Sequence, residues 1–415
     1  MNVRLLLLIF QYSILHSFVI SYGFCFSKIK YMPKILRIIN RFNLGGPTYN
    51  AAYLTKYLAP EFETLLIGGM KDETEGSSEF ILKDMGVDYK ILPRMKRFIN
   101  PFNDLTAYYE IKKVIHDFKP DIVHTHAAKA GALGRQAAAA CKVPVIVHTY
   151  HGHVFHSYFG NFKTSVYKAI ERNLAKKSSA IVAISEKQKR ELVDEHKITA
   201  NAKVHVVPLG FDLNRFQENI EEKRKNFRLK YDLKDDELSV GIVGRLAPVK
   251  NHSLFLEAIK FLKENSSKKI RAFIIGDGEE RAFLEARVNH LGLSEVITFT
   301  SWIQDIATAY PGLDIVCLTS FNEGTPVSLI EAQASNKAIV STCVGGIENV
   351  VVPGKTALLS EVSEKDIFFK NLLLLAENDD LRRMFSLNGW NYVKEKYHFT
   401  RLIINLSALY RVLLK

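Results

Sequence analysis

The segment 314–352 constrains the fold of this chain more than any other part of the sequence. Asp314–Thr319 and Ala338–Thr342 are short apolar runs rich in β-branched residues, and a helical pattern lies between them. We expect Thr325 to cap this helix and Pro326 to occupy its first position. The segment therefore predicts a β-loop-α-β unit whose two strands are parallel.

Two carboxylates fall where such a unit binds ligands. Glu323 lies in the loop before the helix, and Glu331 lies in the second turn of the helix. Open α/β sheets bind ligands at the carboxyl ends of their strands. Gly324 removes a side chain beside the helix N-terminus, where free backbone N–H groups favour an anion. Two glutamates at this spacing are also common on solvated helices, so the spacing alone assigns no function.

The sequence EGTPVSLIEA, residues 323–332, followed by Gly345 and Gly346, resembles the E-x7-E motif of glycosyltransferase family 4. Members of this family are retaining nucleotide-sugar glycosyltransferases of the GT-B fold. The resemblance extends over residues 32–415. It implies an α/β protein with two Rossmann-like, doubly wound domains that face a cleft, and a C-terminal helix that crosses back to the N-terminal domain.

The same resemblance implies a role for each residue of the motif. Glu331 would hold the ribose hydroxyls of the donor and Glu323 the hydroxyls of its sugar. Gly324 and Thr325 would line the donor site between them.

The alternation of strand and helix patterns supports a doubly wound architecture in each half. Strands are predicted from Met32 to Asn40, at 64–68, 88–92, 121–125, 143–149, 180–184 and 204–207, and then at 239–244, 271–276, 296–300, 314–319 and 338–342. A charge-dense run at 218–237 interrupts this alternation and marks the domain boundary. We therefore predict an N-terminal acceptor-binding domain at 32–207, a nucleotide-sugar-binding domain at 208–388, and a helical return at 389–415.

Residues 1–31 precede the predicted first strand. The stretch 5–27 is apolar and long enough to cross a bilayer, although its polar residues make it a mediocre span. It does not fit a signal peptide, because the apolar region is too long and no A-x-A pattern follows it. Two interpretations stay open: a membrane anchor, or a stretch upstream of a true start at Met32.

The charge of the chain is concentrated in its first half. The net charge is +12 over 415 residues. Residues 1–200 hold 28 Lys and Arg against 17 Asp and Glu, a balance of +11, which leaves +1 for residues 201–415. This asymmetry favours an anionic surface or substrate on the N-terminal side. Nucleic acid is not expected, because no nucleic-acid-binding motif accompanies the charge.

Two glycine- or cation-bearing loops are candidates for binding a diphosphate. Gly45 and Gly46 follow the first strand and let backbone approach a phosphate closely. Arg245 and Lys250 follow a later strand, ahead of a helix that Asn251 could cap. A guanidinium and an ammonium together neutralise a diphosphate leaving group. The family resemblance places its glycine loop and its pyrophosphate clamp at these positions.

The remaining candidates are a histidine and a glycine turn. Histidines cluster at His124, His126, His148, His151, His153 and His156, but no carboxylate lies among them, which argues against a metal site. The run VHTYHG, residues 147–152, resembles the strand end of the family's active site. It implies that His151 contacts the donor sugar and phosphate, while His148 and His153 match less closely. Gly276, in the turn Gly276-Asp277-Gly278, resembles the family's nucleobase segment.

Together these features predict a metal-independent, retaining glycosyltransferase without a cofactor. Its expected partners are a nucleotide diphosphate sugar, which we expect to be a UDP-sugar, a lipid-linked or glycan acceptor, and an anionic membrane surface. A cytoplasmic location at the inner face of the cell membrane, peripheral or N-terminally anchored, follows from the lysines and arginines after residue 27. A sugar-nucleotide epimerase of the same fold and an inactive donor-binding scaffold are the alternatives. The four cysteines show no metal or disulfide spacing.

Overall fold

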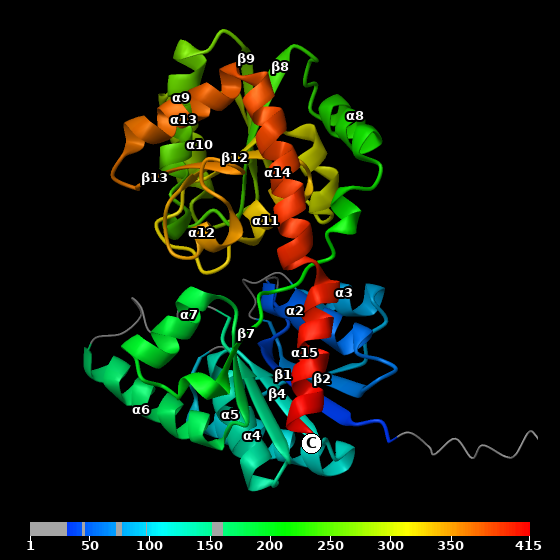
Figure 1. Ribbon diagram of the computed structural model, residues 1–415. Helices are drawn as coiled ribbons and strands as arrows, with labels where there is room; N and C mark the ends of the chain where they lie inside the picture. The colour runs from blue at the N-terminus through cyan, green and yellow to red at the C-terminus, as the bar shows by residue number, and fades with distance from the viewer. Residues whose placement is uncertain (1–30, 44–45, 72–76, 97, 152–160) are drawn as a thin grey trace, which may run out of the picture.

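The computed structural model describes residues 31–415 except 44–45, 72–76, 97 and 152–160. The predicted apolar segment at 5–27 lies outside the described residues. Figure 1 shows two domains, each with a parallel sheet covered by helices, and a red C-terminal pair of helices that runs from one domain to the other. Within the part of the chain that the structure describes, no helix is long and apolar enough to cross a membrane.

The N-terminal domain contains a seven-stranded parallel sheet in the order β3-β2-β1-β4-β5-β6-β7. The chain adds strands outward from β1 to β3 and then returns to the middle at β4, so the order reverses between β1 and β4. The strands are β1 Lys34–Arg41, β2 Glu63–Gly69, β3 Tyr89–Leu92, β4 Ile122–His126, β5 Val145–Thr149, β6 Ala180–Ala183 and β7 Val204–Val206.

The C-terminal domain repeats this logic with six strands in the order β10-β9-β8-β11-β12-β13. Its order reverses between β8 and β11. The strands are β8 Glu237–Val243, β9 Lys269–Ile275, β10 Ile297–Ser301, β11 Ile315–Leu318, β12 Ala338–Thr342 and β13 Ala357–Ser360. The strands predicted from the sequence are confirmed to within a few residues, but the edge strand β13 was missed because ALLS is too short to show a pattern.

Helices connect the strands and cover both faces of each sheet. In the first domain they are α2 Gly46–Tyr57, α3 Glu79–Asp84, α4 Pro101–Phe118, α5 Ala128–Ala140, α6 Asn161–Lys177 and α7 Glu186–Arg190. In the second they are α8 Ile220–Lys230, α9 His252–Asn265, α10 Arg281–His290, α11 Val327–Ala334, α12 Ile347–Val350 and α13 Lys365–Glu377. Because helices cover both faces, the central strands β4, β5, β11 and β12 are buried along their whole length.

The C-terminal helices α14 Asp379–Tyr397 and α15 Phe399–Leu413 join the two domains. At the crossing, Phe211 N donates to Tyr397 O at 2.8 Å and Phe399 N donates to Phe211 O at 3.0 Å. The two chain segments that connect the domains are thereby tied to each other. The predicted start of the return at residue 389 falls inside α14, and the chain crosses at His398 instead.

Helix α15 packs on the N-terminal sheet, which confirms the predicted return helix. Leu402, Leu406 and Tyr410 share an apolar cluster with Ile35 of β1 and Ile122 of β4. Figure 1 shows α15 beside α2. The core of the first domain therefore includes residues from the far end of the sequence.

Candidate functional site

Most predicted site residues of the C-terminal domain lie in loops that leave the carboxyl ends of β8, β9 and β11. The loops after β8 and β11 meet at the point where the strand order reverses. Phe321 N donates to Val249 O at 2.8 Å, and Thr319 Oγ1 donates to Lys250 O at 3.0 Å. A crevice at such a point is where open α/β sheets bind their ligands.

An ion pair connects these two loops. Lys250 Nζ lies 2.6 Å from Glu323 Oε1, and the side chains of both residues are largely buried. Ser320 Oγ donates to the same carboxylate oxygen at 2.6 Å. Arg245, on the same loop as Lys250, is exposed and forms no ion pair with any described residue. Its guanidinium is therefore accessible to an anion in the loop that also carries Lys250.

The predicted cap of α11 is wrong, and the predicted cap of α9 has the right residue without its side-chain hydrogen bond. Helix α11 begins at Val327, with Pro326 as the residue before it, and no side chain caps its N-terminus. Thr325 thus lies in the loop and not at the cap. Asn251 does precede α9, but it has left-handed backbone angles and its side chain makes no cap bond. The tight turn η4, Pro248–Lys250, ends at Asn251 and imposes this conformation.

Two glycines allow the loops to approach closely. Gly345 has a φ of 57°, and a Cβ atom there would lie 1.9 Å from Glu323 O. Its neighbour Gly346 donates its N–H to the same carbonyl at 2.9 Å. Gly276, with a φ of 145°, would place a Cβ atom 1.9 Å from Gly244 O. Both glycines therefore set the backbone positions of the Glu323 and Arg245 loops.

The second glutamate of the motif, Glu331, is half-buried on α11. Glu331 Oε2 accepts a hydrogen bond of 3.2 Å from the Tyr310 hydroxyl, which is itself fully buried. Burial raises the pKa of Glu331 to about 7. The pKa of Tyr49 on α2 is raised by burial and then by the negative charge of Glu331, so α2 lies near this carboxylate across the domain boundary.

The structure describes part of the site's N-terminal side, including Gly46 and His151. Gly45 lies outside the described residues, and Gly46 is the first residue of α2. His151 follows β5, and its Nε2 lies 2.8 Å from Nδ1 of His126 at the end of β4. Burial lowers the pKa of His151 to about 4 and also lowers the pKa of His126, so both imidazoles are neutral near pH 7.

The other histidines take separate positions. His124 stacks on His126 at 4.3 Å, and its Nδ1 contacts the Tyr410 hydroxyl of α15 at 2.5 Å. His148 contacts Thr125 at 2.8 Å, away from that pair. His153 and His156 lie outside the described residues. Among the residues that the structure describes, no group of three or more His, Cys, Asp or Glu side chains has an arrangement that could hold a metal ion.

The structure brings in residues that the sequence did not single out. Ser320 and Tyr310 contact the two glutamates, and His126 contacts His151. Lys187 at the start of α7 donates to Gly345 O at 3.2 Å, which links the N-terminal domain to the loop beside Glu323. Only His126 had a signal in the sequence, its place in the histidine cluster. The others depend on contacts between segments far apart in the chain.

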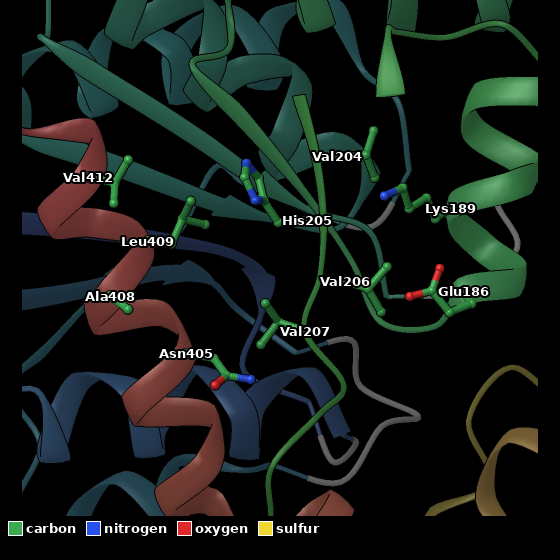
Figure 2. A pocket seen from close by; sticks show the side chains of 10 residues that line it. All are labelled: Glu186, Lys189, Val204, His205, Val206, Val207, Asn405, Ala408, Leu409 and Val412. Atoms are coloured by element: carbon green, nitrogen blue, oxygen red, sulfur yellow. The ribbon is translucent and has the colours of Figure 1, made fainter. Parts of the chain in front are cut away.

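A separate groove lies at the edge of the N-terminal sheet. It has a volume of about 550 Å³ and is lined by β7, the residues Glu186 and Lys189 of α7, and the outer face of α15. Figure 2 shows Leu409 and Val412 of α15 on one side and the β7 side chains on the other. None of the predicted site residues lines this groove.

Comparison with known proteins gives matches in both domains. A family model described as Glycosyltransferase Family 4 matches residues 44–215, and one described as Glycosyl transferases group 1 matches residues 223–391. The UDP-Gal:alpha-D-GlcNAc-diphosphoundecaprenol alpha-1,3-galactosyltransferase of Escherichia coli is 29% identical over 77% of this chain and 82% of that protein. The capsular polysaccharide biosynthesis glycosyltransferase CapM of Staphylococcus aureus is 25% identical over 77% of this chain and 84% of that protein.

The fold is also that of solved structures. The crystal structure of Anabaena HepE in complex with UDP and glucose superposes with a TM-score of 0.76 at 17% identity. That alignment covers 92% of this chain and all of the other. The likeness therefore extends over both domains.

The first prediction compares two glycines that share a left-handed backbone. Gly345→Ala and Gly354→Ala both place a Cβ atom at positive φ, which costs about 1–2 kcal/mol. Only Gly345 faces a backbone oxygen, since nothing lies within 4 Å of a Cβ atom at Gly354. We expect Gly345→Ala to lower the free energy of unfolding more, and to speed amide hydrogen exchange at residues 323–325. Equal losses and unchanged exchange in both variants would contradict the packing described here.

The second prediction uses the raised pKa of Glu331. A carboxyl group whose folded pKa is about 7 instead of 4.5 destabilises the fold once it must ionise, so stability falls as pH rises through that interval. Glu331→Gln removes this penalty. Relative to wild type, its free energy of unfolding should increase by up to about 3 kcal/mol between pH 4 and pH 8. Urea unfolding at both pH values measures it, with the exposed Glu395→Gln on α14 as the control. A difference that does not change with pH would show that the pKa of Glu331 is not raised.

Proposed function

This chain belongs to glycosyltransferase family 4 and is a glycosyltransferase of the GT-B fold, and on that premise we propose which reaction it catalyses. It transfers a hexose or N-acetylhexosamine from a UDP-sugar to a lipid-linked or membrane-proximal glycan. The transfer retains the anomeric configuration and requires neither a metal ion nor a cofactor.

The observation that carries this proposal is the meeting of two cations and a carboxylate where the strand order reverses. Arg245 and Lys250 leave β8, and Glu323 leaves β11, within one hydrogen-bonded pair of loops. A guanidinium fork and an ammonium suit the two phosphates of a nucleotide diphosphate. Lys250 Nζ pairs with the Glu323 carboxylate. A diphosphate would compete for its ammonium and leave Glu323 for the sugar hydroxyls.

The proposed reaction breaks the bond between the anomeric carbon and the diphosphate. Negative charge develops on the leaving diphosphate, where Arg245 and Lys250 stabilise it, and positive charge develops on the sugar ring. The acceptor hydroxyl attacks the same face from which the diphosphate departs and transfers its proton to the leaving phosphate oxygen. His151, neutral near pH 7, hydrogen-bonds the donor from the other domain.

Glu331 has a different role in this proposal. Its carboxylate accepts hydrogen bonds from the ribose hydroxyls. The hydrogen bond from the Tyr310 hydroxyl fixes the position of this carboxylate. Its pKa is raised because desolvation of the carboxylate outweighs the Tyr310 hydrogen bond and the positive charge of Arg215. Two ribose hydroxyls supply the missing donors, so we expect nucleotide binding to favour the ionised form.

The donor and acceptor are proposed from the relatives and from charge. The Escherichia coli relative is named for UDP-Gal and for an acceptor on diphosphoundecaprenol. In this chain the N-terminal half carries a net charge of +11, from 28 basic and 17 acidic residues in 1–200, and that half would receive an anionic lipid diphosphate. We therefore place the enzyme on the cytoplasmic side of the cell membrane, bound peripherally or through residues that precede the first strand.

The third prediction tests the reaction itself. UDP-sugars, but not GDP- or ADP-sugars, should raise the melting temperature of the full chain by mass action. With the stabilising donor and a GlcNAc-diphospholipid acceptor, NMR of the product should show the anomeric configuration of the donor, with unchanged rates in EDTA. Inversion, or conversion of the donor to an epimer without acceptor, would contradict the proposed reaction.

The fourth prediction concerns the two cations. Arg245→Ala and Lys250→Ala should each lower kcat by about a hundredfold or more, because each removes charge that stabilises the departing diphosphate. The matched control is Lys260→Ala on the exposed face of α9, which should leave kcat unchanged. Circular dichroism should show that all three variants are folded. Near-normal kcat in both site variants would exclude this loop as the diphosphate site.

A further inference from the structure

A cluster of apolar side chains protrudes from the N-terminal domain at residues 98–109. Phe98, Ile99 and Phe102 are 73%, 87% and 84% exposed, and Leu105 and Tyr109 are also more than half exposed. Soluble proteins expose single apolar residues commonly, but contiguous apolar patches mark sites of interaction. We call these five residues the 98–109 surface.

The helix α4 is apolar on two sides, and only one of them is needed for the fold. Its inner side buries Ala107, Ile111 and Ile115 against the sheet. Phe102, Leu105 and Tyr109 recur at intervals of three and four residues, which places them together on another side. None of these three residues belongs to a core cluster of the described residues, so packing within that part of the chain does not account for their apolar character.

Basic residues border this surface. Arg94 and Lys96 are exposed in the loop before α4, and Lys113 is exposed one turn beyond Tyr109. The ammonium of Lys112 lies over the Tyr108 ring at 5.7 Å. Asp104, the acidic residue in the first turn of α4, is neutralised by Lys129 at 2.5 Å. The surface therefore presents apolar side chains at its centre and positive charge at its margin.

The surface is attached to the N-terminal side of the proposed active site. Lys129, near the start of α5, donates to the carbonyl oxygens of Lys96 at 2.9 Å and Phe98 at 2.6 Å. Three residues before Lys129, His126 ends β4 and contacts His151. Residues 93–96 follow the carboxyl end of β3, the same edge of the sheet at which β4 and β5 end.

We propose that the 98–109 surface inserts into the headgroup region of an anionic lipid bilayer and holds the acceptor side of the active site against the membrane. This inference rests on the proposed function, because it supplies the site with an acceptor that resides in that membrane. A helix side that combines aromatic and aliphatic residues with lysines binds the plane of a bilayer interface. A protein partner fits less well, because lysine is depleted at protein interfaces.

The experiment uses the full chain with single tryptophan probes. Phe102→Trp places an indole at the centre of the surface, and Leu229→Trp places one at a similarly exposed position on α8 of the other domain. With vesicles of phosphatidylcholine and phosphatidylglycerol, the Phe102→Trp emission should shift to the blue, and brominated lipid should quench it. Leu229→Trp should show neither effect. The signal of unsubstituted protein is subtracted, because Trp302 and Trp390 contribute to both variants.

A second pair of variants measures the contribution of the surface to binding. Ile99→Ser with Phe102→Ser should weaken the partition of the chain onto these vesicles at least about tenfold, whereas Leu229→Ser should not. Both apolar side chains are so exposed that the double variant should fold. Turnover on a water-soluble acceptor without vesicles should be unchanged, which separates this inference from the proposed reaction.

Three results would overturn the inference. One is that brominated lipid does not quench the fluorescence of Phe102→Trp, even if the chain binds the vesicles through other residues. Another is an unchanged partition of the Ile99→Ser, Phe102→Ser variant. The third is self-association in the absence of lipid that this double variant abolishes, since the surface would then be an interface between two copies of the chain. If brominated lipid quenches Phe102→Trp but the chain transfers no sugar, the result would support membrane binding by the 98–109 surface and contradict the proposed reaction.

Discussion

The Lys250–Glu323 ion pair is the contact on which the C-terminal half of the site depends. It joins the loops that leave β8 and β11, the two strands between which the sheet reverses its order. Gly345 is needed because the next loop packs against the carbonyl of Glu323, and Lys187 of the other domain binds that same loop. An anion that draws Lys250 away from Glu323 would therefore act on a contact that reaches both domains. In the proposed reaction, the site would in this way couple diphosphate binding to the position of Glu323, the carboxylate proposed to bind the sugar.

The N-terminal half of the site is arranged around neutral imidazoles. Burial keeps the pKa values of His124, His126 and His151 low, so these side chains exchange hydrogen bonds instead of carrying charge. The buried Arg37 donates to the Tyr410 hydroxyl at 3.1 Å. Tyr410 belongs to α15, so the last helix of the chain contacts the layer of residues next to His151. The crossing helix thus supports the site as well as the domain arrangement.

The sequence was sufficient to locate most strands along the chain and the loops that carry candidate site residues. Buried parallel strands are continuous apolar runs, and the cation and glutamate loops follow such runs directly. The predicted side-chain cap bonds of α9 and α11 are not formed. A tight turn sets the backbone before α9, and a proline sets it before α11. Tyr310, Ser320 and Lys187 could not be found, since their contacts join distant segments. The exposure of Phe98 and Phe102 could not be predicted from the sequence either. An apolar residue near or within a helical pattern is compatible with burial as well as with exposure.

A crystal structure with UDP bound tests the central claim most directly, because it shows which groups receive the diphosphate. The account predicts that Arg245 and Lys250 contact the phosphate oxygens, that Lys250 Nζ has left Glu323, and that both ribose hydroxyls donate to Glu331. A structure in which Lys250 and Glu323 stay paired while the diphosphate binds elsewhere would contradict it.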